Sequence, residues 1–278
     1  MAVTLMPIAS SDGGPGLTVE VRGDVSAQER DSAEEMVRDV LARHRRVVAD
    51  ARVRVSGAAC GGPGLVQVNL RVCGAPARVQ VPGRTVPAAI TTAASRLDRQ
   101  ITRLSTTWQD WPWPDPERCS LGLPGAGRIV REKAYRLRVA RPCQAAATLH
   151  AMDYEAFLYT DVETGEDAVV YRAGPVGLAL ARQVTMRPPT RVGSLAMTVN
   201  PRKTPVLTRQ QAARWLADGW LPFLFFTDHD TGRGNLLYRR YDGNLGLVTP
   251  VLERAPRPPR PAASGGRVTT GPVDQETG

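Results

Sequence analysis

The chain has 278 residues, a formal net charge of +9 and a pI near 10.0. Its length and its hydrophobic fraction of 42% suit a folded protein with two domains rather than a disordered chain. The basic balance favours a polyanionic partner, because arginines neutralise phosphates and release their counterions. The sequence has neither a window of about 18 apolar residues nor a secretory signal, so we expect a cytoplasmic protein that does not bind membranes.

Residue types that usually carry chemistry are scattered along the chain. The three histidines, His44, His150 and His229, fall in three separate segments, and the four cysteines form no C-x-x-C pair. P-loop, G-x-S-x-G and dinucleotide-binding patterns are missing from the sequence. We therefore expect no metal, no cofactor and no catalytic site, and the protein is predicted not to be an enzyme.

Residues 17–107 have the pattern of one α+β domain, and residues 1–16 before it are predicted to be disordered. Alternation of apolar and polar residues predicts strands at 17–22, 51–57, 65–72 and 77–83. A capping-box pattern from Ser26 to Glu29 opens a first helix that ends near Val48, and a second helix covers about 85–106. The order βαβββα predicts a four-stranded sheet with both helices on one face.

A proline-rich segment, residues 108–130, is predicted to be a linker. It contains Trp108, Trp111 and Trp113. Two roles fit these rings: stacking on RNA bases, or packing of the linker back onto a domain. The sequence leaves both open.

The rest of the chain contains a repeat, since a shift of 67 positions aligns ten identical residues over 142–172. A degenerate first copy spans 131–186, a linker 187–195 and the second copy 196–252, and residues 253–278 are predicted to be a disordered tail. Each copy is predicted to be a small β-rich α+β unit: a short strand, a short helix and a hairpin turning at Thr-Gly. The segment after the hairpin is expected to be two residues shorter in the first copy. Because about 50 residues make a small core, we expect the copies to pair with each other or with another chain.

Arginines gather on the two predicted helices of the first domain. Arg96, Arg99 and Arg103 recur at i, i+3 and i+7, about 140° from the apolar stripe, which predicts a row of exposed guanidinium groups. The first helix adds Arg38, Arg43, Arg45 and Arg46. Such a surface suits the phosphates of RNA, but solvation or complementation of the helix dipole explains it equally well from charge alone.

Motifs near the C-terminus carry a family resemblance. The segments PVLT, FFTDHDTG and LLYRRYDGNLGLV are similar to the C-terminal domain of long-form bacterial ribosome hibernation-promoting factors. AAI at 88–90 and RLDRQITR at 96–103 resemble the N-terminal domain of that family more weakly. The tandem copy makes the chain similar to the dormancy- and hypoxia-associated factors of actinobacteria. The resemblance covers about 17–107 and 131–252.

The resemblance implies a partner and a mode of binding. Such a protein binds the 30S subunit and the 70S ribosome, with its N-terminal domain against 16S rRNA in the decoding region. The positions that match the family's contact residues are Arg96, Arg99 and Arg103, with Arg38 matched less closely. Where the family continues the second helix with lysines, this chain has the sequence Ser-Thr-Thr at 105–107, which puts the rRNA contact there in doubt.

The second copy supplies the residues expected to pair or dock the repeats: Phe225, Phe226, Tyr238, Arg239, Arg240, Asp242, Gly243 and Leu247. In ordinary long forms this domain pairs two chains and joins two ribosomes, and here an internal copy is expected to occupy the pairing surface. We therefore expect a translation inhibitor that stabilises idle, single 70S ribosomes under stress or dormancy. The alternative is a stress-regulatory module that binds proteins of the transcription or signalling machinery without RNA.

Overall fold

The computed structural model describes residues 16–106, 127–173, 177–190, 195–219 and 221–251. Apart from Gly16, the two segments predicted to be disordered lie outside these residues. So does most of the predicted linker, including its three tryptophans.

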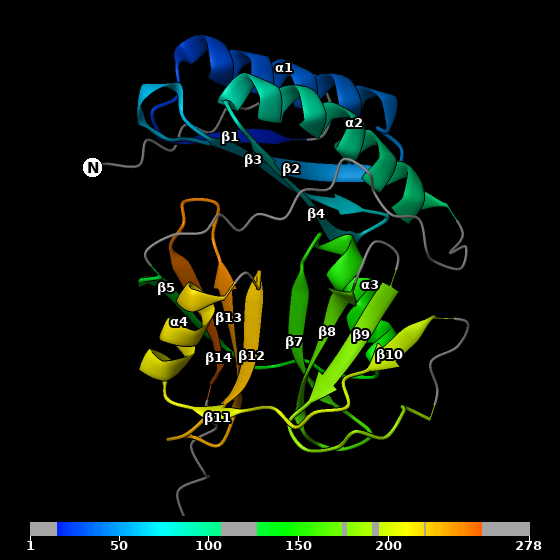
Figure 1. Cartoon of the computed structure of the whole chain (residues 1–278). Coiled ribbons are helices and arrows are strands. Elements are labelled where there is room, and N and C mark those ends of the chain that lie inside the picture. The colour runs from blue at the N-terminus through cyan, green and yellow to red at the C-terminus, as the bar shows by residue number, and fades with distance from the viewer. Residues whose placement is uncertain (1–15, 107–126, 174–176, 191–194, 220, 252–278) are drawn as a thin grey trace, which may run out of the picture.

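The N-terminal domain is a four-stranded sheet with two helices on one face (Figure 1). The strand order is β1-β2-β3-β4; β1 is parallel to β2, and the other neighbours are antiparallel. The elements are β1 (Leu17–Gly23), α1 (Ala27–Arg43), β2 (Val48–Gly57), a short 3-10 turn η1 (Ala59–Gly61), β3 (Gly64–Val72), β4 (Ala75–Gly83) and α2 (Val86–Ser105). The predicted α+β fold is confirmed.

Local sequence signals explain where the first helix begins. The Glu29 amide donates to Ser26 Oγ at 3.2 Å, and the Ser26 amide donates to the Glu29 carboxylate at 2.8 Å, so the predicted capping box is present. The predicted end near Val48 is wrong. The helix stops at Arg43, because Val48 already pairs with Val72 in the sheet, and one residue cannot serve both elements.

The C-terminal half contains two copies of one unit, and their helices and hairpins keep the offset of 67 residues. The first copy supplies β5 (Ile129–Tyr135), β6 (Val139–Ala140), α3 (Pro142–Ala151), β7 (Ala156–Asp161), β8 (Asp167–Ala173) and β9 (Gly177–Arg182). The second supplies β10 (Met197–Val199), β11 (Val206–Leu207), α4 (Arg209–Asp218), β12 (Phe223–Asp228), β13 (Gly234–Arg239) and β14 (Leu245–Pro250). Gly165 and Gly232, at φ +71° and +66°, make the two Thr-Gly turns.

The two copies have the same length through their last strand. Tyr171 pairs with Ala179 in the first copy, and Tyr238 pairs with Gly246 in the second, eight residues on in both. The expectation that the first copy is two residues shorter is therefore wrong. That expectation matched the end of the first copy's segment to Leu247, whereas the equivalent residue of the second copy is Leu245.

The copies exchange their first strands. β5 of the first copy runs parallel to β14 in the sheet β11-β12-β13-β14-β5, and β10 of the second copy runs parallel to β9 in the sheet β10-β9-β8-β7-β6. Each sheet is thus closed at one edge by a strand from the other copy. This corrects the proposed boundaries at 131 and 196: β5 begins two residues earlier, at Ile129, and both first strands belong to the opposite sheet.

The two five-stranded sheets pack face to face, with one helix on each outer face. Alternate residues of one strand serve the two layers: Val169 lies between the sheets, whereas Val170 lies under α3. In the second copy Leu236 lies between the sheets and Leu237 under α4. The central cluster draws residues from both copies, so neither copy has a complete core alone.

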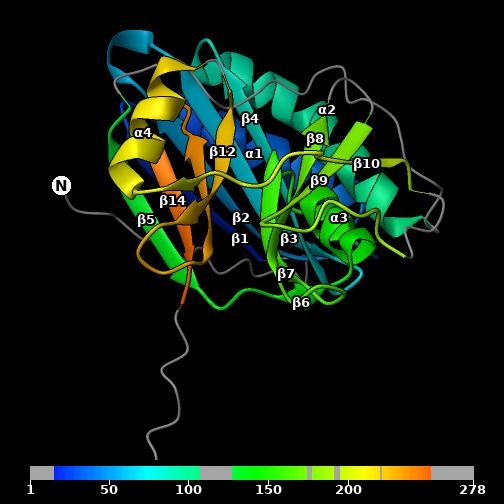
Figure 2. The same cartoon turned by 60° about the horizontal axis from the view of Figure 1, so that its bottom comes forward.

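The C-terminal repeats cover the face of the N-terminal sheet that its helices leave open. Figure 1 shows α1 and α2 on the outer side, the four-stranded sheet beneath them, and the repeats below the sheet. Figure 2, with the bottom turned forward, shows the two repeats side by side across this sheet. The helix layer therefore faces away from the rest of the molecule.

Candidate nucleic-acid interface

The outer helix layer carries six of the seven arginines predicted to bind rRNA. We call this set the basic helix surface: Arg38, Arg43, Arg45, Arg46, Arg99 and Arg103, all exposed. Arg43 is the last residue of α1 and residues 44–46 follow it, and with Ser105 at the end of α2 they border an open hollow where the two helices finish. Cations at this place complement the carbonyl ends of both helices and still face solvent.

Part of this surface is neutralised within the chain. Arg38 pairs with Glu34 one turn earlier at 2.6 Å. Arg43 Nη2 and His44 Nε2 reach Asp98 on α2 at 3.2 and 3.0 Å. Hydrogen bonds from His44 and then Arg43 lower the pKa of the Asp98 carboxyl group, although burial opposes the shift. His44 thus joins the two helices.

Arg45 and Arg46 differ from their neighbours, because neither has an ion-pair or hydrogen-bond partner among the described residues. Exposed arginines without an acidic neighbour keep their full attraction for phosphate. Within the basic helix surface, the hollow at the helix ends is consequently its least neutralised part.

Arg96 does not belong to this surface, and the prediction that it is exposed is wrong. Its side chain is 4% exposed and faces the first C-terminal repeat. Nη2 donates to both carboxylate oxygens of Asp153 at 3.1 Å, and Nη1 donates to the Gln80 carbonyl at 2.6 Å. The helical spacing placed Arg96 on the polar side correctly, but a second domain packs against that part of α2.

The contact around Arg96 holds the N-terminal domain on the end of α3. The Asp153 carboxylate also accepts the Gln80 amide at 2.9 Å, and Gln100 donates to the His150 carbonyl at 2.8 Å. Arg78 donates to the Met152 carbonyl at 3.0 Å. Backbone carbonyls at the end of a helix have no partner within it, so these donors satisfy groups that the fold leaves open.

The shape of the chain at Asp153 aims its carboxylate at Arg96. Asp153 has φ +50°, and the Tyr154 amide donates back to the Leu149 carbonyl at 2.9 Å, which closes α3 with a left-handed turn. Aspartate tolerates this conformation better than most residues. The second copy has Trp220 at the equivalent position, so the charged contact belongs to the first copy alone in sequence.

The residues predicted to pair the repeats fall into three groups. Phe225 and Tyr238 lie in the cluster between the two sheets, whereas Phe226 and Leu247 lie under α4 in the core of the second copy. Arg239 closes the end of α4 by donating to the carbonyls of Leu216, Ala217, Gly219 and Leu221. Arg240 pairs with Asp242 at 3.0 Å beside a turn at Gly243.

Sequence reasoning missed most of the first copy's share of the central cluster, including Leu137, Ala156, Leu158 and Val169. The pairing residues predicted from the sequence all lie in the second copy, where the family resemblance is strong. The continuous apolar runs at 156–159 and 168–171 were the available signal, since strands that are apolar on both faces imply a second layer.

The described residues provide neither a metal-binding cluster nor a membrane-spanning helix. They contain no group of three or more His, Cys, Asp or Glu side chains arranged to hold a metal ion. None of the described helices is both long and apolar enough to span a bilayer.

Comparison with known proteins identifies the family. Residues 125–180 match the family described as Sigma 54 modulation/S30EA ribosomal protein C terminus. These residues form most of the first copy, whereas the motifs that carry the resemblance in the sequence lie in the second. Two solved structures, a ribosomal subunit interface protein from Coxiella burnetii and the Protein Y N-terminal domain of Thermus thermophilus, are 14% and 21% identical with TM-scores of 0.26 and 0.25. Each match covers 30% of this chain and 92% of the solved one.

Relatives of nearly full length are more similar. Proteins called dormancy associated translation inhibitor, from the CDC 1551 and H37Rv strains of Mycobacterium tuberculosis, are 48% identical over 245 residues. The match covers 85% of this chain and 89% of each relative. The chain therefore belongs to the long-form ribosome hibernation-promoting factors, in the group of the mycobacterial dormancy associated translation inhibitors.

Proposed function

We propose that this protein is a ribosome hibernation factor of the cytoplasm that inhibits translation without catalysing a reaction. It binds the small subunit near the decoding centre and protects idle ribosomes under stress or dormancy. The name of the 48% identical relatives supports the inhibition of translation. The observation that supports the mode of binding is the exposure of the basic helix surface on the outer side of the molecule, while the opposite sheet face is covered.

Phosphate binding by this surface is tested by charge reversal. The variant Arg45→Glu/Arg46→Glu/Arg99→Glu/Arg103→Glu is expected to bind 30S subunits about 100-fold more weakly, with a smaller dependence of affinity on salt. Cosedimentation with purified subunits at several salt concentrations measures both. Arg96 stays unchanged because it holds the domains together.

A matched control reverses four exposed basic residues of the C-terminal half, Arg187→Glu/Arg202→Glu/Lys203→Glu/Arg214→Glu. This control is expected to bind within about twofold of the parent, because it keeps the helix layer intact. Equal loss in both variants would show that total charge, rather than this surface, governs binding. Full binding by the fourfold variant would refute the proposed interface.

We also propose that the protein stabilises single 70S particles. The exchanged strands β5 and β10 complete both sheets within one chain, and Phe225 and Tyr238 meet the first copy in the central cluster. A surface already used by an internal copy is not available to a second chain. Sucrose-gradient sedimentation with purified ribosomes should give a 70S peak that persists at low magnesium, and a 100S peak would refute this part.

A further inference from the structure

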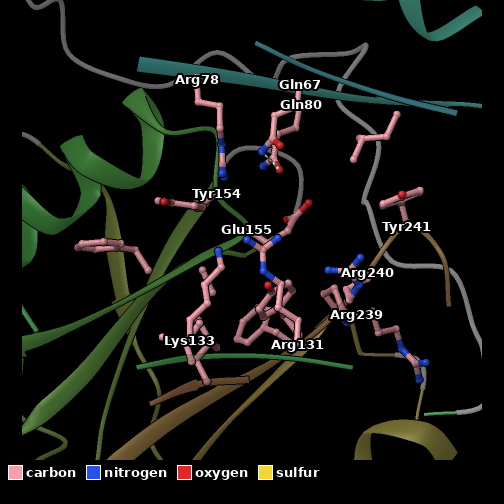
Figure 3. Close-up of a pocket in the computed structure, with 18 of the residues that line it drawn as sticks. Gln67, Arg78, Gln80, Arg131, Lys133, Tyr154, Glu155, Arg239, Arg240 and Tyr241 are labelled. Atoms are coloured by element: carbon pink, nitrogen blue, oxygen red, sulfur yellow. Dashed lines mark hydrogen bonds between the residues drawn. The ribbon is translucent and has the colours of Figure 1, made fainter. Parts of the chain in front are cut away.

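A cavity of about 320 Å³ lies where the N-terminal sheet meets both repeats, between β5, the start of β7 and the second repeat. Figure 3 shows Arg78, Gln67 and Gln80 entering it from the N-terminal sheet, Arg131 and Lys133 from β5 on the opposite side, and Arg240 with Tyr241 from a third direction. The cavity is thus built from segments far apart in the sequence. It is separate from the basic helix surface, which lies beyond the sheet.

Positive charge dominates this cavity. Arg22, Arg54, Arg78, Arg131, Lys133 and Arg240 all line it, whereas Glu155 is the sole acid among its described lining residues. Glu20 beside the cavity pairs with Arg22 and Arg54 at 2.7 and 2.8 Å, and Asp242 pairs with Arg240 at 3.0 Å. These carboxylates are therefore already used.

Arg131 and Lys133 have no counter-ion among the residues that the structure describes. They stand two residues apart on β5, so both side chains leave the same face of the strand, while Glu132 between them points away and meets Arg209. Neither Arg131 nor Lys133 has an ion-pair or hydrogen-bond partner among the described residues. Burial, then the nearby charges of Arg131 and Arg78, lower the pKa of Lys133 to about 8.

The internal repeat shows that the fold does not need these cations. At the equivalent positions of the second copy, Arg131 is replaced by Thr198 and Lys133 by Asn200, and both copies still exchange the strand. Arg240 likewise corresponds to Ala173 in the first copy. These three cations therefore lie only on the side of the repeat pair that faces the N-terminal sheet. Collecting like charges there opposes folding unless an anion joins them.

The remaining wall suits an aromatic, hydrogen-bonding group. Gln67 Nε2 donates to Gln80 Oε1 at 3.1 Å and Gln80 Nε2 donates to the Asp153 carbonyl at 3.3 Å, which leaves Gln67 Oε1 as an acceptor for a ligand. The Tyr154 ring already stacks with Phe157, so Tyr241 provides the ring face for a base. The Arg78 guanidinium lies 4.4 Å from the centre of the Tyr154 ring. Ligand pockets usually measure about 300–1,000 Å³, so this cavity suits a ligand of mononucleotide size.

We propose that this interdomain cavity is a binding site for a free nucleotide, with its phosphates on Arg131 and Lys133 and its base against the glutamine and tyrosine side chains. The ligand would touch β4 and β5 together. Binding therefore holds the repeats on the N-terminal sheet, and the proposal stands independently of ribosome binding.

Isothermal titration calorimetry of the full chain with ATP at pH 8 tests the site. We expect a single site, and the variant Arg131→Ala/Lys133→Met should bind at least about 10-fold more weakly, because it loses two charge-assisted contacts. An anion also raises the pKa of Lys133, so the parent should take up protons on binding. The apparent enthalpy then depends on the ionisation enthalpy of the buffer, and this dependence should vanish in both Lys133→Met and Lys133→Arg, because neither side chain titrates at pH 8, while only Lys133→Arg keeps the positive charge that holds the phosphates.

The matched control is Arg202→Ala/Lys203→Met, which removes the same charges from an exposed segment that does not line the cavity. It should bind ATP like the parent. Far-UV circular dichroism and thermal unfolding establish that both double variants fold. The proposal is overturned by absence of ATP binding at about 1 mM, by equal loss in the two variants, or by binding of a short single-stranded RNA but not of ATP.

Discussion

The contact between Arg96 and Asp153 predicts that a single neutral substitution opens the molecule. In the variant Asp153→Asn the side chain keeps its shape, its tolerance of the left-handed backbone and an acceptor for the Gln80 amide, but it loses its charge. The Arg96 guanidinium, whose side chain is 4% exposed, then loses its ion pair with Asp153. Breaking a buried pair in this way costs about 3 kcal/mol.

This free-energy cost weakens the docking of the repeats on the N-terminal sheet and not the fold of either domain. Opening the interface returns Arg96 to water, so the penalty cannot exceed the free energy that holds the repeats on the N-terminal sheet. The backbone N–H of Gln80 reports this opening directly, since it donates to the Asp153 carboxylate across the interface at 2.9 Å. We expect its hydrogen exchange, followed by NMR, to accelerate about 100-fold in Asp153→Asn, while amides inside β2 and β3 keep their protection.

A double-mutant cycle with Arg96→Gln separates the ion pair from other effects. If the pair carries the docking, the two substitutions together should cost at least about 1 kcal/mol less than the sum of the single ones. Additive effects, or exchange of Gln80 that changes by less than about threefold, would refute the reasoning. Small-angle scattering should show a larger radius of gyration in the single variant.

Three further predictions concern the repeats and the cavity. Phe225→Ala should cost about 3 to 4 kcal/mol and expose amides in both copies, whereas Phe226→Ala should affect the second copy alone; hydrogen exchange by strand distinguishes them. Because the folded pKa of Lys133 lies near 8, below its usual 10.5, the unfolded chain holds more protons between these values, so stability should rise with pH across this window; below pH 8 the penalty is fully present. Urea unfolding of Lys133→Met should remove this rise, which solvent screening of the partly exposed ammonium limits to about 1 to 2 kcal/mol, and an identical pH profile would contradict the assignment. Gly246→Ala should cost about 1 to 2 kcal/mol in urea unfolding, since its Cβ meets the Tyr238 ring, and Tyr238→Leu in the same chain should restore part of the loss.

Local patterns were sufficient for the N-terminal domain. Period-two alternation placed its four strands, the capping box placed the start of α1, and the apolar stripe of α2 placed Leu97 and Ile101 in the core. These signals depend on contacts between near neighbours and one sheet. Where a second domain intervened, the same reasoning was incomplete: Arg96 and Gln100 look like solvated polar residues in the sequence but form the interdomain contact.

The strand exchange could not be predicted from the sequence, and the reason is physical. A parallel edge strand such as β5 has the same alternation and composition whichever sheet it joins, because the backbone supplies the hydrogen bonds. Its partner is fixed by topology and by the length of chain that precedes α3. The sequence repeat was detected at an offset of 67 residues, but the similarity of the two units does not show that each sheet is completed by a strand of the other unit.

Because both copies lie in one chain, they can carry different residues at equivalent positions, which two identical chains cannot do. In a symmetric pair, a charge placed on one copy appears on both, so an arginine and lysine on the first strand would crowd two surfaces. Here the first copy has Arg131, Lys133 and Asp153, and the second has Thr198, Asn200 and Trp220 in their places. The side of the repeat pair that meets the N-terminal domain therefore has the Asp153 contact with Arg96 and the basic cavity. The central cluster between the two sheets holds the copies together without these differences in sequence. Exchanging the two sets of residues between the copies should therefore preserve the strand exchange and abolish docking.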